Sequence, residues 1–288
     1  MRPVLRRIGS LRWHLVLLTL PYALLWKDLP GSGGATFIIV YAMLVLYYGT
    51  NLDLSTVAAR RDPPIALFRG RETLDPDFLA AARTFLIGLI IIGLIGLTII
   101  QWRLGLVATA MFFFIMFFGG VFARSGKPRS FWPELLWPIT FLIFPAFVLG
   151  AQGDPATSMT DEAIAPRQWS MPRPMQAATV LGAMLLCAYI LICQLRDRIA
   201  DASIGLKTPA TLSRASGAAI LGLILFAVIG LACWGAAGPL WTWLVPALIA
   251  WGAVLTILAL AREADGWAAG TWAATAILTG FTLAASAS

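Results

Sequence analysis

Long apolar runs separated by short polar stretches fill the whole chain of 288 residues. Nine of these runs are long enough, or nearly so, to cross the ~30 Å hydrocarbon core of a bilayer as helices. They cover residues 12–27, 35–50, 79–100, 103–123, 132–151, 175–195, 214–234, 239–261 and 267–286. No connecting loop is long enough to form a separate soluble domain. The pattern predicts one all-α membrane domain over residues 1–288 with about nine transmembrane helices.

The composition excludes a soluble protein and several kinds of site. Hydrophobic residues make up 59% of the chain and charged residues 12%, with a mean hydropathy of +0.83, whereas soluble domains carry roughly 25% charged residues. His14 is the one histidine, and the three cysteines lie inside apolar runs without metal-ligand spacing, which argues against a histidine or cysteine metal centre. Ionisable residues are nearly absent from the runs, which argues against ion-coupled transport.

The basic residues are distributed unequally between the two sides that nine spans define. Four lie on one side, and the other 17 of the 21 lie on the side of the N-terminus. The four are Lys27, Arg103, Arg167 and Arg173. Because basic loops stay in the cytoplasm, this bias predicts a cytoplasmic N-terminus and an external C-terminus. In a membrane protein this distribution explains the net charge of +7, so no nucleic-acid partner is expected.

Two carboxylates follow the sixth apolar run in the segment "LRDRIADASIGLKTPATL" (Leu195–Leu212). On a helix, Asp197 and Asp201 would share one face with Cβ atoms roughly 5–6 Å apart. The like charges repel, and a divalent cation such as Mg²⁺, which prefers oxygen ligands, would remove that cost. The alternative is an ordinary helix end at which the aspartates pair with Arg196 and Arg198.

The residues after the carboxylates favour a phosphate site. Gly205 can end the helix, and Pro209 favours a break before the next span. Between them, Lys207 and Thr208 are donors suited to phosphate oxygens.

The pattern R-D-x-x-x-D-x-x-x-G-x-K-T resembles the second aspartate-rich motif of the UbiA-type intramembrane prenyltransferases. In detail it looks most like the menaquinone-pathway branch, the dihydroxynaphthoate prenyltransferases. The resemblance implies nine helices in a UbiA-like bundle around a central cavity, with both motifs on cytoplasmic loops of a protein of the bacterial inner membrane. It implies a polyprenyl diphosphate donor, an aromatic or quinone-precursor acceptor and Mg²⁺ as cofactor. It also implies that Asp197 and Asp201 bind the metal, while Arg196 and Lys207 bind the diphosphate.

The family's first motif, N-D-x-x-D-x-x-x-D or N-D-x-x-D-x-x-x-G-x-D, is expected after the second span. There this chain reads "NLDLSTVAARRDPPIALFRG", in which Asn51 matches the leading asparagine. Residues without a carboxylate stand at the expected aspartate positions, namely Leu52, Ser55 and Ala59. Asp53 and Asp62 lie nearby but out of register, and the tail Pro63–Gly70 is similar to the family's R-P-I-x-x-G element.

This departure leaves three interpretations open. Asn51 with Asp53 or Asp62 holds one metal ion. Alternatively, three arginines replace a metal as diphosphate ligands, because a guanidinium matches phosphate geometry: Arg60, Arg61 and Arg69. In the third interpretation, the protein no longer ionises diphosphates.

Two further segments fit the resemblance less specifically. Phe122–Pro138 is similar to the family's basic connector, in which Arg124, Lys127 and Arg129 would lie near the diphosphate, but it also fits an ordinary cytoplasmic loop. Aromatic residues that could stabilise an allylic cation are Phe112, Phe113, Phe114, Phe117, Phe118, Phe131, Trp132 and Trp137. Lipid-facing packing is the alternative for each of them. Pro133, Pro138 and Pro145 should kink the fifth span.

Three functions remain compatible with the sequence. The first is transfer of a prenyl group to an aromatic or lipid-like acceptor in the membrane. The second is cyclisation of the same cation without an acceptor, as in UbiA-type terpene cyclases. The third is a non-catalytic membrane protein that binds an isoprenoid lipid.

Overall fold

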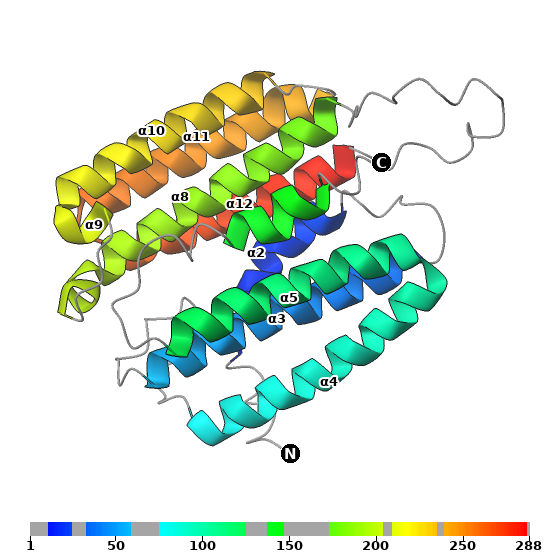
Figure 1. The fold of residues 1–288 in the computed structure, drawn as a ribbon. Helices are drawn as coiled ribbons and strands as arrows, with labels where there is room; N and C mark the ends of the chain where they lie inside the picture. The colour runs from blue at the N-terminus through cyan, green and yellow to red at the C-terminus, as the bar shows by residue number, and fades with distance from the viewer. Residues whose placement is uncertain are drawn as a thin grey trace, which may run out of the picture.

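The structure is a computed structural model that describes residues 11–24, 33–58, 75–124, 137–146, 173–203, 209–234 and 239–286. Every regular element within these ranges is a helix, as the sequence predicts (Figure 1). The elements are α2 (Trp13–Ala23), α3 (Gly33–Ala58), α4 (Pro76–Ile100), α5 (Trp102–Arg124), the π-helix η2 (Ile139–Ile143), α8 (Arg173–Ser203), α9 (Pro209–Leu212), α10 (Arg214–Trp234), α11 (Pro239–Ala261) and α12 (Asp265–Ser286).

Five helices in the described ranges are long and apolar enough to cross a membrane. These candidate spans are Gly33–Leu52, Pro76–Ile100, Ala177–Ile199, Thr242–Ala261 and Asp265–Ser286. Three shorter apolar helices accompany them: Trp13–Ala23, Trp102–Phe117 and Gly217–Cys233. Each predicted span overlaps a helical segment of the structure. The chain is therefore an all-helical membrane protein, and the count of nine spans stays a prediction.

The helices form two groups joined by α2 and η2. Helix α3 packs on α4 and α5, while α8 packs on α10 and α12, and α11 packs on α10 and α12. Helix α2 contacts both groups through α3, α8 and α12, and η2 contacts α2, α5 and α8 (Figure 1). In the apolar part of α8, 78% of the residues are buried, against 22% in α4 and 28% in α11. Helix α8 is thus the central span, and α4 and α11 are peripheral.

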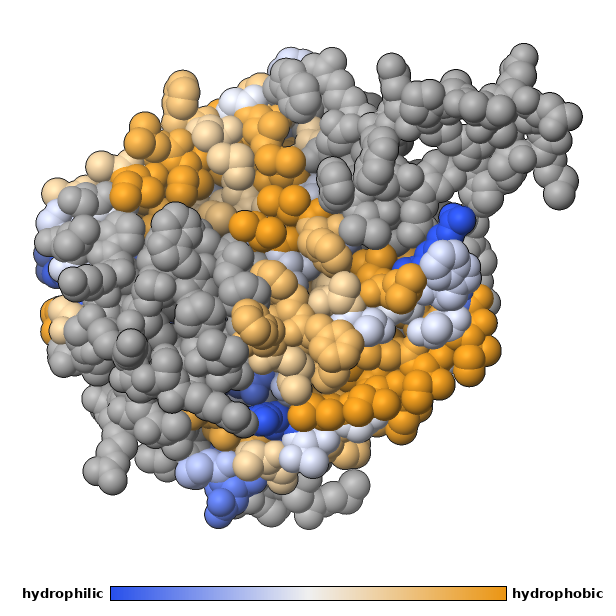
Figure 2. All heavy atoms as spheres, in the orientation of Figure 1, coloured by the Kyte–Doolittle hydropathy of each residue, from blue (hydrophilic) through white to orange (hydrophobic). Residues whose placement is uncertain are grey.

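The outer surface of the helices is apolar. Ile92, Ile99, Leu223, Phe226 and Trp251 are between 67% and 80% exposed, and the described part of one face is mostly hydrophobic (Figure 2). Exposed side chains of this size would be costly in water, whereas in a bilayer they face lipid.

Local contacts explain where helix α4 begins and how the turn between α11 and α12 is held. The Asp75 carboxylate accepts hydrogen bonds from the backbone N–H groups of Asp77 and Phe78 at 3.0 and 3.3 Å, which caps α4 ahead of Pro76. Glu263 takes a positive φ of 57° in the turn between α11 and α12. Arg214, at the start of α10, donates to the Leu260 carbonyl at 2.6 Å and pairs with Asp265 at 3.1 Å, which fixes that turn.

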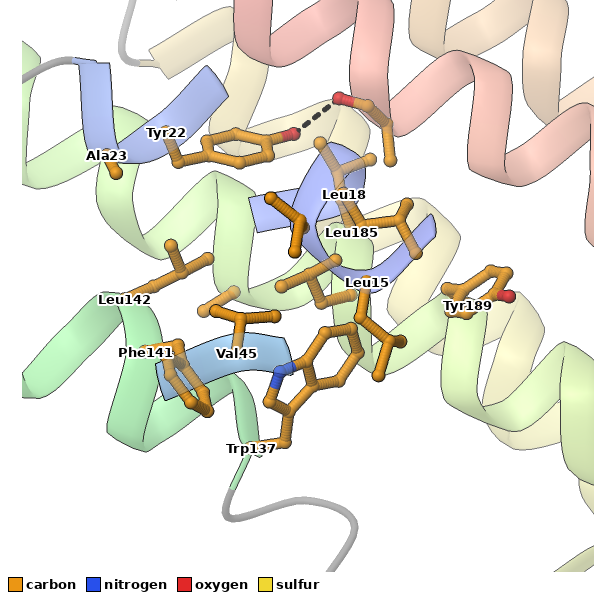
Figure 3. Close-up of a cluster of buried hydrophobic side chains, with 14 of the residues drawn as sticks. Leu15, Leu18, Tyr22, Ala23, Val45, Trp137, Phe141, Leu142, Leu185 and Tyr189 are labelled. Atoms are coloured by element: carbon orange, nitrogen blue, oxygen red, sulfur yellow. Dashed lines mark hydrogen bonds between the residues drawn. The ribbon is translucent and has the colours of Figure 1, made fainter. Parts of the chain in front are cut away.

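Tyr22 of α2 inserts into a slot between α8 and α12. The slot exists because glycine stands on both sides: a Cβ atom at Gly182 would lie 2.6 Å from the Tyr22 ring, and one at Gly280 would lie 3.1 Å from it. The Tyr22 hydroxyl donates to the Ala276 carbonyl of α12 at 2.8 Å (Figure 3). One turn earlier on α12, the Trp272 indole donates to the Leu185 carbonyl of α8 at 2.9 Å. These contacts hold α2, α8 and α12 together.

The predicted fifth span contains a π-helical turn between two prolines. Pro138 precedes the turn, and the Phe144 N–H bonds to the Ile139 carbonyl five residues back. Pro145 has no N–H to give to the Phe141 carbonyl at i−4, and the Tyr41 hydroxyl of α3 donates to that carbonyl instead, at 2.9 Å. The helix distortion that the prolines predict is therefore present as a π-turn. The hydrogen bond from Tyr41 holds this turn against α3. Pro133 lies outside the described residues.

We expect Tyr41→Phe to lower the free energy of unfolding by about 1–3 kcal/mol, because it leaves the buried Phe141 carbonyl without a donor. Thermal unfolding in detergent measures the change. Tyr47→Phe is the matched control, because the Tyr47 hydroxyl donates to the thioether of Met116, a weak acceptor. Equal losses in the two variants would contradict this role for Tyr41.

Candidate functional site

The two motif segments lie at the same end of the helical bundle, which we call the motif end. It holds the C-terminal ends of α3 and α8 and the starts of α9 and α10 (Figure 1). A Cβ atom at Gly217 of α10 would lie 2.9 Å from Leu195 and 3.1 Å from Ala210, so α8, α9 and α10 meet closely there.

The first motif begins on a helix and not on the predicted loop. Helix α3 continues to Ala58, so residues 51–58 lie on its last two turns. Asn51 is half-buried there. The side chain of Asp53 lies outside the described residues, as do Asp62, Arg60, Arg61 and Arg69 entirely. The three interpretations of the first motif, namely a metal ion, arginines in place of a metal, or lost diphosphate ionisation, therefore all stay open.

The second motif also begins on a helix, because α8 runs on to Ser203. Asp197 and Asp201 are thus about one turn apart on a continuous helix. The helix ends two residues before Gly205, the residue predicted to end it, and Pro209 begins α9. The Asp201 side chain and all of Lys207 lie outside the described residues. In the connector, Arg124 is the last residue of α5, its side chain is not described, and Lys127 and Arg129 fall outside.

Arg196 and Asp197 form a two-bond ion pair at the motif end. The Arg196 Nε donates to Asp197 Oδ1 at 2.7 Å, and Nη2 donates to Oδ2 at 2.6 Å. The two side chains are 11% and 22% exposed. This pair is the arrangement that the ordinary helix-end interpretation predicts for Asp197. A carboxylate has about four lone-pair positions, and the guanidinium uses two of them, so each oxygen keeps one for a further donor or a metal.

A second arginine, Arg12, approaches the same end of α8 from α2. It is the N-cap residue of α2, and its side chain runs over Gly49 of α3, where a Cβ atom would lie 2.9 Å from the Arg12 Cβ. Both Arg12 and Arg196 act electrostatically on the buried Tyr189 hydroxyl of α8. Leu15, one turn after Arg12, belongs to the same buried cluster as Tyr189 (Figure 3). The charges of two arginines on different helices therefore act on one buried tyrosine.

Such an arrangement suits an anion. In a medium of low dielectric constant, a negative group stabilises the charge of a nearby guanidinium. Asp197 supplies one negative charge on the Arg196 side. A phosphate group would add oxygens that accept hydrogen bonds from guanidinium N–H groups. The Tyr189 hydroxyl lies within hydrogen-bonding reach of Cys193, one turn further along α8.

Sequence reasoning did not identify Arg12, Gly49 or Tyr189 as site residues. In the sequence, Arg12 contributed only to the excess of basic residues on the side of the N-terminus. Its position depends on a close approach between α2 and α3 that Gly49 permits, and no local motif encodes that approach.

The aromatic residues that could stabilise an allylic cation differ in exposure in the structure. Phe113 and Phe117 are 65% and 61% exposed, so they face lipid and the alternative interpretation holds for them. Phe112 is buried against Tyr47, with ring centroids 5.8 Å apart. Trp137 is buried and lies parallel to Tyr48 at 6.3 Å. Phe114 is half-buried, and the side chains of Phe118, Phe131 and Trp132 lie outside the described residues.

A column of aromatic side chains, which the sequence did not predict, lies between α3 and η2. It consists of Phe37, Tyr41, Tyr48 and Phe141. Phe141 packs edge-on against Tyr41 and Tyr48, with centroids 5.6 and 5.9 Å away, and Phe37 lies 6.3 Å from Tyr41. Tyr48 precedes Asn51 by about one turn of α3. The column therefore leads from the bundle interior toward the motif end.

The donor chemistry at the motif end fits Mg²⁺ only in part. Asn51 and Asp197 offer amide and carboxylate oxygens, which are magnesium ligands. Within the described ranges, no three histidine, cysteine, aspartate or glutamate side chains gather as a metal centre would require. The remaining expected ligands, Asp53, Asp62 and Asp201, have side chains that are not described.

No family model, curated protein or solved structure matches this chain.

Proposed function

We propose that this protein is a Mg²⁺-dependent intramembrane prenyltransferase of the UbiA type. It would transfer a prenyl group from a polyprenyl diphosphate to a small aromatic or quinone-precursor acceptor. The motif end would face the cytoplasm of a bacterial inner membrane, in agreement with the charge bias of the loops. The observation that best supports the proposal is the location of both motif segments at one end of an apolar bundle, where Arg196 and Asp197 form a close ion pair.

The arrangement suits a substrate with an anionic head and an apolar tail. Arg12 and Arg196 can bind phosphate oxygens, because a guanidinium donates two parallel hydrogen bonds to them. The interior beneath is lined by aromatic and aliphatic side chains such as Tyr48, Phe141 and Leu15. A prenyl chain would bury its surface there, and the absence of bulk water would protect a reactive cation.

In the proposed reaction, the allylic C–O bond breaks and its electron pair leaves with the diphosphate. A ring carbon of the acceptor then forms a bond to the prenyl carbon and loses its proton. Bound Mg²⁺ would neutralise charge on the leaving diphosphate, and the expected ligands are Asp197, Asp201 and Asn51, with Asp53 or Asp62. Arg12, Arg196 and Lys207 would hold the diphosphate as its charge increases.

A second candidate function is binding of an isoprenoid diphosphate without catalysis. Two observations favour it. The Asp197 carboxylate already has a two-bond partner in Arg196, and the first motif lacks the family's carboxylates. In that case the arginines would bind the substrate head and no bond would break.

Product analysis separates these functions. The purified protein in lipid nanodiscs is incubated with Mg²⁺, prenyl diphosphates of several chain lengths and a panel of aromatic acceptors, and the products are identified by mass spectrometry. A prenylated acceptor is the expected result. Cyclic hydrocarbons formed without an acceptor would identify a terpene cyclase. Bound but unchanged prenyl diphosphate under all conditions would favour the non-catalytic candidate.

Arg12→Gln is expected to weaken binding of a non-reactive prenyl thiodiphosphate by about 10- to 100-fold, the range for loss of a hydrogen bond from a charged donor. Calorimetric titration measures the affinity. Arg262→Gln is the matched control, because Arg262 is exposed in the turn between α11 and α12 and its loss removes the same charge. Equal affinities of the two variants would remove Arg12 from the site.

A further inference from the structure

Among the residues that the structure describes, the buried indole N–H of Trp137 finds no hydrogen-bond acceptor. Its side chain is 4% exposed, and the Nε1 atom is buried without a hydrogen-bond partner. Buried polar groups in native proteins are nearly always paired, and an exception calls for an explanation such as a missing ligand. The unpaired N–H is therefore a feature for which folding alone gives no reason.

The surroundings of the indole are apolar and aromatic. Tyr48 lies parallel to it, with 6° between the ring planes and 6.3 Å between the centroids. Figure 3 shows the indole in one cluster with Leu15, Val45 and Phe141, and the nitrogen is drawn on the side of Val45. A water molecule at this N–H would need two to four polar partners, and the side chains of Leu15, Val45 and Phe141 offer none. An oxygen atom of an otherwise apolar ligand can accept a hydrogen bond from this N–H without needing further polar partners.

The backbone next to Trp137 is also unusual. The π-turn Ile139–Ile143 begins two residues later, and π-helical turns are rare and occur frequently at functional sites. Tyr41 fastens this turn to α3 through the Phe141 carbonyl. Tyr48, the parallel partner of the indole, is half-buried and therefore more exposed than Trp137.

We propose that Trp137 and Tyr48 form a binding site for a planar, lipid-soluble molecule that carries a neutral carbonyl or phenol oxygen. The Trp137 N–H donates to that oxygen, and aromatic faces of the column contact the ring of the ligand. The N–H is a single neutral donor and its named neighbours carry no cation, so a carboxylate or phosphate would be a poor occupant. The identification of this ligand as the acceptor of the prenyl group rests on the function proposed above, whereas the binding does not.

A comparison of two probes tests the site without any turnover. 1,4-Naphthoquinone and naphthalene share a flat fused-ring body, and only the quinone carries oxygen acceptors. Affinities for the protein in nanodiscs, corrected with empty nanodiscs, should favour the quinone by about tenfold, the value of one hydrogen bond. The absence of any quinone preference in the wild-type protein would overturn the proposal before a variant is made.

Trp137→Phe then assigns the preference to the indole N–H. The variant keeps an aromatic ring next to Tyr48 and should bind both probes equally, with an unchanged affinity for naphthalene. Its melting temperature should stay close to that of the wild type, because the cavity left by the smaller ring costs stability while the removal of a buried donor without a partner gains it. A quinone preference that persists in the variant would overturn the proposal. Affinity for prenyl thiodiphosphate, measured in parallel, reports on the proposed function separately.

Discussion

Gly182→Leu is expected to abolish the stable folded protein. A Cβ atom at Gly182 would lie 2.6 Å from Cδ1 and 2.7 Å from Cε1 of Tyr22, a ring that is 1% exposed. The ring cannot retreat, because Gly280 of α12 closes the other side of its slot. Leucine would expel Tyr22, cost about 3 kcal/mol or more in overpacking, and break the bond from Tyr22 to the Ala276 carbonyl. Size-exclusion chromatography and thermal unfolding in detergent measure the loss.

Gly222→Leu provides the matched control for this prediction. Gly222 lies on α10 with an exposed surface, and a Cβ atom there would meet nothing within 4 Å. Leucine forms helices better than glycine by up to about 1 kcal/mol, and at this position it would face lipid. The control should therefore fold as well as the wild type. If both variants fold equally well, Tyr22 does not join α2, α8 and α12 as described.

Asp197→Asn is expected to reduce the rate of diphosphate release by about 10²–10³-fold, the typical effect of removing one electrostatic contribution to a transition state. Asparagine keeps the shape of the side chain but loses the negative charge that a metal ion requires. It also frees Arg196 from the ion pair. Because the two side chains are mostly buried, leaving Arg196 without its partner should also cost about 1–3 kcal/mol of stability.

Two measurements keep activity and folding apart in this variant. Thermal unfolding checks that Asp197→Asn remains folded, and Arg262→Gln serves as a charge control on an exposed turn. A normal rate of release in Asp197→Asn would show that Asp197 pairs with Arg196 for structural reasons only. The ordinary helix-end interpretation would then replace the metal site at this residue.

The apolar pattern predicted the helices well where charges or prolines border a run. Helices α10 and α11 cover Arg214–Trp234 and Pro239–Ala261, the same residues as the predicted spans. The apolar pattern did not mark the end of α3, which continues to Ala58, whereas α8 ends at Ser203, two residues before the helix stop expected at Gly205. Hydropathy marks where a helix leaves the membrane, and a helix in water beyond that point gives no apolar signal. For that reason the apolar pattern did not show that the first motif begins on a helix.

The candidate site was less predictable than the fold, because its contacts join distant residues. The sequence identified Asp197 and Arg196 as neighbours but left open whether they would pair or bind other groups. Arg12 and Tyr189 are 177 positions apart in the numbering, and the contact of Arg12 with Gly49 follows from packing of α2 on α3. The unpaired Trp137 N–H likewise depends on which groups surround it. Side-chain neighbours of this kind follow from the packed structure and not from local spacing.

Release of inorganic diphosphate by the wild-type protein tests the central claim most directly. The purified protein in nanodiscs is mixed with prenyl diphosphates of several chain lengths and an aromatic acceptor, in the presence of either Mg²⁺ or EDTA. The released inorganic diphosphate is then quantified. The proposal predicts release with Mg²⁺, little release with EDTA, and a rate at least 100-fold lower in Asp197→Asn. No release at any chain length, from wild type and Asp197→Asn alike, would contradict an enzymatic function of this protein.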